Sequence, residues 1–169
     1  MKGRGAPWQL VALAATLLLA LALRLAPWGT NRFLEDEALY SYWGLRIASG
    51  ADPMLDEEPV DKPPLHPYTL AMSFLLSGQA PDAGAGSGVG PGHENAARLP
   101  SLLASMASIV LVYALALQLH DDARTGLLAA LLLALSPFDI LFASTAFTDP
   151  LMVALVLGAL VAVADNRPG

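Results

Sequence analysis

Residues able to do chemistry are concentrated in one polar stretch, residues 33–64, which lies between apolar segments. Asp36 and Glu37 stand near its start, and Lys62 precedes two prolines at its end. A partly desolvated carboxylate can act as a general base toward a hydroxyl group, and an ammonium group at a helix N-terminus suits a phosphate. The pattern is therefore compatible with a general base and a phosphate contact. The alternative is a solvated acidic helix start, favoured by the helix dipole, with a lysine that only balances charge.

Asp36 and Glu37 are adjacent, so on a helix their side chains diverge and cannot form a carboxylate pair with each other. One of them can face a substrate while the other contacts a supporting group. If Asp36 lies between helices at a membrane surface, partial burial raises its pKa and a nearby Lys62 lowers it. A carboxylate poised in this way is a candidate base for an acceptor hydroxyl.

A third candidate, Asp149, interrupts a long apolar run that extends from Thr125 to Ala164. A carboxylate inside such a run is costly to bury and by default indicates a functional site. Pro150 follows it, so Asp149 can also cap the helix that starts there, and the two roles are compatible. Asp139, the other acid in the run, is predicted to be an interfacial turn residue.

His66 is a further candidate for binding a substrate or a metal ion, but it has no partners at metal-ligand spacing. The sequence contains no Ser/His/Asp arrangement, no glycine-rich phosphate loop and no zinc spacing. It also contains no cysteine, which excludes disulfides and thiolate metal sites. The polar stretch and Asp149 therefore remain the main candidates.

The elements that carry these residues are predicted to be membrane helices. Of the 169 residues, 55% are hydrophobic and 14% are charged, and uncharged runs extend from Gly5 to Leu23 and from Leu99 to Leu119. A helix of about 20 residues crosses the hydrocarbon core of a bilayer. We therefore expect an all-α integral membrane protein. Nucleic acid is not an expected partner, because the nine lysines and arginines are scattered and form no basic face.

We expect four transmembrane helices, at about residues 8–27, 95–119, 123–141 and 147–164. The alternative for the first segment is a cleaved signal peptide. This segment is longer than the apolar core of a signal peptide, which is usually about 7–15 residues. It ends at Arg24 rather than at a cleavage site of small residues. A retained helix is therefore favoured, and tryptophans at both its ends suit the aromatic belts of a membrane.

The first loop, residues 28–93, is predicted to hold two juxtamembrane helices at about 34–49 and 64–77. The first helix is too polar to cross a bilayer and the second is too short, so we expect both helices to lie in the interface. A flexible linker rich in glycine and proline, residues 79–92, follows them. The predicted apolar stripe of the first helix consists of Leu39, Trp43 and Ile47.

The number of spans decides which candidate residues share one side of the membrane. With a cytoplasmic N-terminus, the first loop lies outside and the fourth span begins on the outer side. Asp36, Lys62 and Asp149 then share the extracytoplasmic face. If residues 65–77 crossed the bilayer, Asp149 would lie opposite Asp36, and the shortness of this helix argues against that. The distribution of basic residues supports neither orientation.

Four motifs occur in an order that resembles the N-terminal part of the GT-C-type membrane glycosyltransferases. They are Asp36-Glu37-Ala38-Leu39-Tyr40, Lys62-Pro63-Pro64-Leu65, Ala97-Arg98-Leu99-Pro100-Ser101 and the lone Asp149. The chain resembles in particular the family 39 enzymes, the ArnT and protein O-mannosyltransferase-like group. The resemblance extends from about Arg24 to Ala164. Each motif is common by itself, and their order between spans of suitable length makes the resemblance more specific.

The resemblance implies inverting transfer of a sugar from a polyprenyl-phosphate carrier to an acceptor hydroxyl on the extracytoplasmic face of the cell membrane. It implies that Asp36 is the general base, that Lys62 contacts the donor phosphate and that Asp149 belongs to the catalytic site. Further substrate contacts are expected from Glu37, Tyr40, Asp61, His66 and Arg98. The acceptor is a lipid, a glycan or a protein, membrane lipids surround the spans, and a divalent metal is left open as a cofactor.

Three features depart from the family pattern. The glycine-rich insert at 79–92 is long. The family often has a basic residue shortly before the aspartate that corresponds to Asp149, but no basic residue lies between Arg124 and Arg167 in this chain. The chain ends at Gly169, whereas family members are longer, so we expect an N-terminal portion that carries half of the site. The alternatives are an inactive fragment and a non-catalytic multi-span protein, such as a scaffold or transporter subunit. Charges that gather at one surface favour an interfacial reaction over a transport path.

Overall fold

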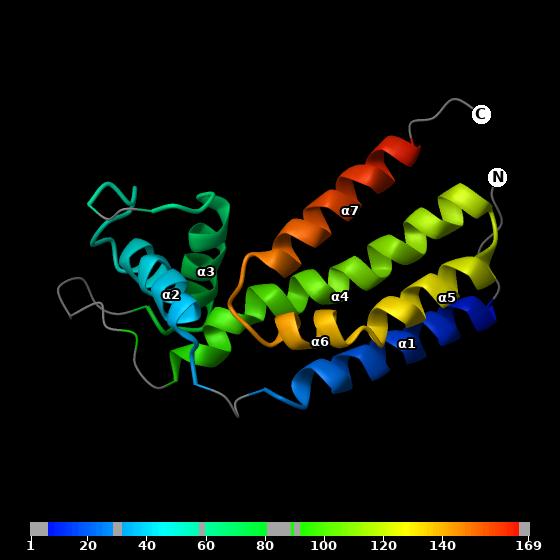
Figure 1. The fold of residues 1–169 in the computed structure, drawn as a ribbon, viewed down its shortest axis with the longest axis horizontal. Helices are drawn as coiled ribbons and strands as arrows, with labels where there is room; N and C mark the ends of the chain where they lie inside the picture. Colours follow the sequence, from blue (N-terminus) through cyan, green and yellow to red (C-terminus); the bar gives the residue numbers. More distant parts are fainter. Residues whose placement is uncertain (1–6, 29–31, 58–59, 81–88, 90–91, 166–169) are drawn as a thin grey trace.

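The computed structural model describes residues 7–28, 32–57, 60–80, 89 and 92–165, which fold into seven helices without a strand (Figure 1). The helices are α1 (Pro7–Leu25), α2 (Glu35–Ala48), α3 (Leu65–Leu76), α4 (His93–His120), α5 (Ala123–Ala134), α6 (Pro137–Ala143) and α7 (Asp149–Asp165). The all-α fold predicted from the sequence is therefore confirmed. The expected linker at 79–92 lies mostly outside the described residues.

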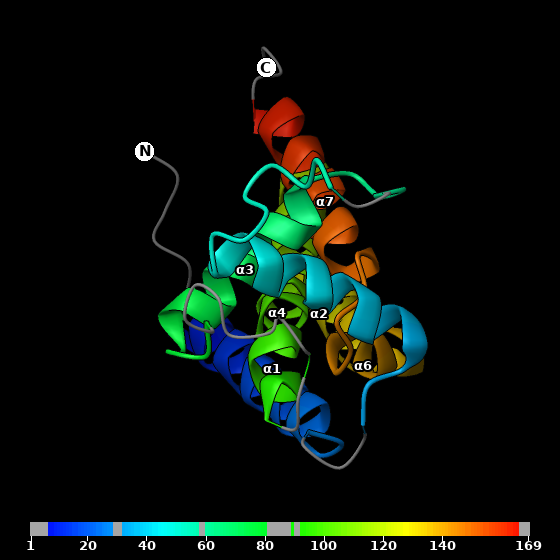
Figure 2. The same cartoon turned by 90° about the vertical axis from the view of Figure 1, so that its left-hand side faces the viewer.

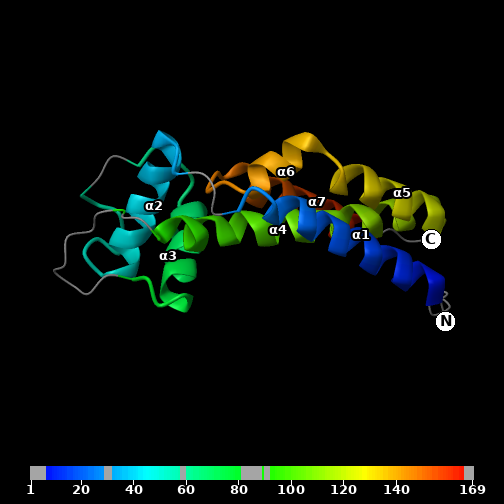
Figure 3. The ribbon, with the colours of Figure 1, turned by 90° about the horizontal axis from the view of Figure 1, so that it is seen from below.

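The helices form an elongated bundle with a two-helix head at one end (Figures 1 and 3). The longest helix, α4, runs along the bundle, where it packs against α5 and α7, and reaches α3 at the head. In the head, α2 and α3 pack on each other and lie across the end of α4 (Figure 2). The polar stretch that holds the candidate residues thus forms a packed head on a long apolar bundle.

The bundle has the dimensions and surface of membrane helices. Both α1 and α4 are long and apolar enough to cross a bilayer, and α5 with α6 forms a third candidate that is bent by 60°. α7 has 17 residues, which is near the lower limit for a span. Large apolar side chains point outward, and Leu10, Leu18 and Leu132 are 66%, 68% and 64% exposed. Such a surface is expected where helices face lipid hydrocarbon.

The expected span at 123–141 is broken in the structure into two helices, which together remain a candidate for one bent span. α5 ends at Ala134, and α6 begins at Pro137 after Ser136, whose hydroxyl accepts the Asp139 N–H at 3.5 Å. A proline lacks the N–H that would continue the first helix, and it fits the first position of a new one. The Ser-Pro pair therefore ends one helix and starts the next.

In the head, α2 and α3 lie within one residue of the bounds expected for the juxtamembrane helices. They approach closely because Gly44 has no side chain, and a Cβ there would lie 2.7 Å from the Cβ of Leu70. Tyr40 and Trp43 are buried in the core of the head, whereas Leu39 is 44% exposed. The buried face of α2 is therefore rotated relative to the predicted stripe.

A charged side chain is buried inside the bundle. Arg24, near the end of α1, is fully buried, pairs with Asp139 of α6 and donates from Nε to Ser105 Oγ at 2.6 Å. It also donates to the carbonyl oxygen of Ala134 at 3.2 Å, at the end of α5, where carbonyl groups have no helical partner. The prediction of a turn at Asp139 is wrong, since the residue lies in α6 and neutralises a buried guanidinium group.

Removing one member of this pair is expected to destabilise the protein more than removing both. Asp139→Leu leaves the Arg24 guanidinium group buried without its counter-charge, which should lower the free energy of unfolding by about 3–5 kcal/mol. Combining Arg24→Leu with Asp139→Leu removes both charges and should recover most of this loss. Thermal unfolding in detergent micelles, followed by circular dichroism, compares the two variants. A double variant less stable than Asp139→Leu alone would contradict this interpretation.

Candidate functional site

Two of the other candidate residues, Lys62 and His66, lie beside the side chain of Tyr40, which is buried in the head. Its ring lies edge-on to the ring of His66, with centroids 5.6 Å apart, and to the ring of Phe147, at 6.1 Å. The ammonium group of Lys62 lies close enough to the Tyr40 phenol to interact with it electrostatically. One aromatic side chain thus joins α2, the segment that leads into α3 and the segment that leads into α7.

Glu37 is buried and connects three parts of the structure. Arg98 of α4 donates to its carboxylate from Nε at 3.1 Å and from Nη2 at 3.3 Å. The same carboxylate accepts the N–H groups of Leu34, at 2.9 Å, and of Ala146, at 2.8 Å. Arg98 is also buried, and it donates to the carbonyl oxygen of Arg32 at 3.2 Å. Glu37 and Arg98, both predicted to bind substrate, therefore form a buried ion pair that is hydrogen-bonded to the protein itself.

Asp36 precedes Glu37 on α2, and its side chain diverges from the buried one. The residue is exposed, and within the described part of the chain no hydrogen bond or ion pair engages its carboxylate. Because it precedes Tyr40 by four residues, it lies on the same face of α2 as Tyr40. The expected partial burial of Asp36 between helices is therefore not found, and the carboxylate expected to act as a base is exposed to solvent and to a ligand.

Lys62 lies in the segment before α3, with its Nζ 3.6 Å from the Asp61 carboxylate and its side chain 38% exposed. The Tyr40 phenol and then the Asp61 carboxylate raise the pKa of Lys62 above its ordinary value, so the ammonium form persists at neutral pH. Asp61 is itself 73% exposed, and ion pairs between exposed groups contribute little free energy. An anionic ligand can therefore replace Asp61 beside the ammonium group.

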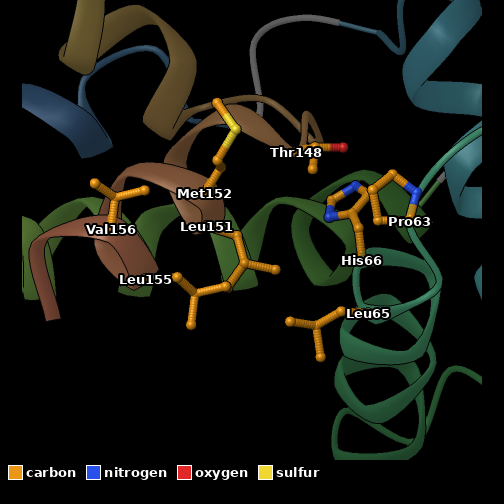
Figure 4. A pocket seen from close by; sticks show the side chains of 8 residues that line it. All are labelled: Pro63, Leu65, His66, Thr148, Leu151, Met152, Leu155 and Val156. Atoms are coloured by element: carbon orange, nitrogen blue, oxygen red, sulfur yellow. The ribbon is translucent and has the colours of Figure 1, made fainter. Parts of the chain in front are cut away.

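His66, at the start of α3, is only 2% exposed. Its Nε2 lies 2.9 Å from the carbonyl oxygen of Ala146, while Nδ1 has no hydrogen-bond partner among the described residues. Burial lowers the pKa of His66 and outweighs the opposite effects of the Ala146 carbonyl and the Asp149 carboxylate, so the imidazole is neutral at pH 7. The ring forms part of the wall of an apolar pocket of about 190 Å³ between α3 and α7 (Figure 4).

Asp149 is exposed at the first position of α7. The carbonyl of Thr148 accepts the first hydrogen bond of this helix, so Asp149 lies in its first turn, where the helix dipole favours an acid. Asp149 and Asp139 line a second pocket of about 260 Å³, whose walls include Phe138 and Phe142. Among the described residues, no three histidine, aspartate or glutamate side chains form a group that could hold a metal ion.

The sequence did not reveal what holds the backbone that leads into α7. Glu37 and His66 both contact the Ala146 peptide, and Ser101 Oγ donates to the next carbonyl oxygen at 3.2 Å. These contacts join residues that are 46 to 109 positions apart. The partner in each contact is a backbone group, which the residue types in the sequence do not reveal. As a result, the position of Asp149 is set by helices that precede it by a large part of the chain.

Comparison with known proteins shows the family of the chain. The sequence model of the dolichyl-phosphate-mannose-protein mannosyltransferase family matches residues 61–165. The comparisons with curated proteins and with solved structures gave no match. The matched range includes Lys62 and Asp149 and begins after Asp36. Since it spans more than half of a chain with apolar helices long enough to cross a bilayer, this membrane protein belongs to the dolichyl-phosphate-mannose-protein mannosyltransferase family.

Proposed function

We propose that this protein transfers a sugar from a polyprenyl-phosphate carrier to an acceptor hydroxyl, with inversion, on the extracytoplasmic face of the cell membrane. The family supports glycosyl transfer by a membrane enzyme in general terms. The observation that carries the finer proposal is the grouping of three elements around Tyr40. They are the segment with Lys62, the helix that bears Asp36 and the segment that leads to Asp149.

In the proposed reaction, Asp36 accepts the proton of the acceptor hydroxyl while the hydroxyl oxygen attacks the anomeric carbon of the sugar. The bond between this carbon and the phosphate oxygen breaks, and the polyprenyl phosphate leaves with the bonding electrons. The Lys62 ammonium group stabilises the negative charge that develops on the phosphate. Attack from the side opposite to the leaving group inverts the anomeric centre. Asp149 orients the acceptor at the head of α7.

The other candidate residues take supporting roles in this proposal. Glu37 and Arg98 fix the head on α4, because their polar atoms already bond to the protein. Tyr40 and Asp61 lie beside the Lys62 ammonium group and favour its charged form, and the donor phosphate then replaces Asp61. A transport path is less well supported than an enzyme, because Arg24 and Asp139 neutralise each other inside the bundle and do not form a line of free charges.

Asp36→Asn is expected to lower the rate of sugar transfer by about 10²–10⁴-fold, because an amide cannot accept the hydroxyl proton. Glu35→Gln removes a charge at the preceding exposed position of α2 and should leave the rate near that of the wild type. Transfer of radiolabelled sugar from a polyprenyl-phosphate donor is measured in membranes that contain equal amounts of each variant. Equal rates for Asp36→Asn and Glu35→Gln would refute the assignment of the base.

Lys62→Met is expected to lower kcat/KM for the donor by about 10- to 100-fold, the loss typical of one hydrogen bond to a charged group. Lys62→Arg keeps the charge and should retain most of the activity. The raised pKa means that the ammonium form persists at every pH below the ordinary lysine value and is lost only above it. The ratio of wild-type to Lys62→Met activity should therefore stay constant between about pH 6 and 9. A ratio that falls steeply within this range would show that Lys62 does not act as a fixed cation.

A further inference from the structure

One peptide group, that of Ala146, is held at both ends by buried side chains from the head. Its N–H donates to Glu37 Oε1 at 2.8 Å, and its carbonyl oxygen lies 2.9 Å from His66 Nε2. Glu37 and His66 belong to α2 and α3, and their exposed fractions are 1% and 2%. Ala146 precedes Asp149, the first residue of α7, by three positions. The two side chains thus fix the approach to α7 relative to both helices of the head.

The role of each imidazole nitrogen of His66 follows from its partner. A carbonyl oxygen only accepts hydrogen bonds, so Nε2 carries the hydrogen and donates it to Ala146. In the neutral ring, Nδ1 is then an acceptor, and it has no partner among the described residues. A buried polar atom without a partner destabilises the folded state, so an apolar ring would suit packing alone better than this imidazole. The hydrogen bond from Nε2 is therefore the feature that requires a histidine here.

We propose that His66 is a positioning residue, which donates its Nε2–H to the Ala146 carbonyl and thereby sets Asp149 at a fixed distance from Asp36. This inference rests on the proposed function, in which these two carboxylates act on one acceptor. Asp36 adjoins Glu37 on α2, and Asp149 follows Ala146 by three positions, so the held peptide connects the two acids through few residues. A displacement of about 1 Å between reacting groups can lower a rate by about 10²-fold.

Three substitutions of His66 separate this role from packing and from ligand contact. In His66→Gln the amide nitrogen can occupy the position of Nε2 and donate to Ala146. In His66→Asn the amide reaches only the position of Nδ1, toward the apolar pocket. His66→Phe keeps a ring and removes both nitrogens. We expect sugar transfer by the Gln variant to stay within about tenfold of the wild type, whereas the Asn and Phe variants lose about 10²-fold in kcat, with an unchanged KM for the donor.

A distance measurement tests the geometry without depending on activity. The chain has no cysteine, so Leu39→Cys on α2 and Leu160→Cys on α7, both at exposed positions, can carry spin labels. Pulsed electron paramagnetic resonance on the labelled protein in lipid nanodiscs should give a narrow distance distribution. We expect it to stay narrow with His66→Gln and to broaden with His66→Asn and His66→Phe. Thermal unfolding confirms that each variant is folded before it is labelled.

Several results would overturn the proposal. Narrow distributions in all variants, or a broad one with His66→Gln, would show that the hydrogen bond to Ala146 does not fix α7. Activity retained by His66→Asn and lost by His66→Gln would assign the role to Nδ1 and a ligand in the apolar pocket. Broadening without loss of transfer would show that the held peptide does not serve the reaction. Absence of transfer by the unsubstituted protein would instead refute the proposed function. The distance measurement would still test whether the hydrogen bond from His66 to Ala146 fixes α7 relative to α2.

Discussion

The buried carboxylate of Glu37 is the constraint on which the rest of the site depends. An ionised carboxylate is tolerated in the interior only when it is paired and hydrogen-bonded, and Glu37 meets this condition through Arg98 and two backbone N–H groups. These partners belong to α4, to the start of α2 and to the segment before α7. The need to satisfy one charge therefore ties the head to the bundle. Removing either member of such a pair typically costs about 3–5 kcal/mol, because the other charge stays buried.

A second buried pair acts in the bundle, and the two pairs together control one stretch of chain. Arg24 holds the end of α5 through Ala134 and the start of α6 through Asp139. Glu37 and His66 hold the same stretch at its far end, at Ala146. The stretch between α5 and α7 is therefore anchored at both ends by buried polar groups. Asp149 follows directly, so its position reflects two charge pairs rather than the local preference of a loop.

Local signals in the sequence were sufficient for much of the fold. Uncharged runs and helical spacing predicted α1 and α4 as spans, and prolines and a short apolar run predicted the start and length of α3. The break between α5 and α6 also has a local signal, since Ser136 caps α6 and Pro137 starts it. The continuous hydrophobicity of the surrounding segment obscured this signal. The predicted stripe of α2 grouped Leu39 with Trp43 by apolarity, but only Trp43 is buried, because the close contact of α2 with α3 lies at Gly44.

The partners within the site could not be predicted in this way. Glu37 and Arg98 are 61 positions apart, and Arg24 and Asp139 are 115 apart, so no spacing rule connects them. The backbone of Ala146 has no side-chain signature at all. What the sequence offered was a set of residue types in a particular order. Which of them stay exposed, as Asp36 does, and which are buried in contacts that hold the fold, as Glu37 is, depends on packing between distant segments.

The central claim is that Asp36, Lys62 and Asp149 act together on the extracytoplasmic side of the membrane. The most direct test is single-cysteine labelling in this cysteine-free chain, with cysteine placed at each of the three positions in turn and a membrane-impermeant maleimide applied to intact cells. We predict that all three positions are labelled from outside, at rates comparable to one another. Labelling of Asp149→Cys only after the membrane is permeabilised would place it on the opposite side from Asp36, and a shared site would then be impossible.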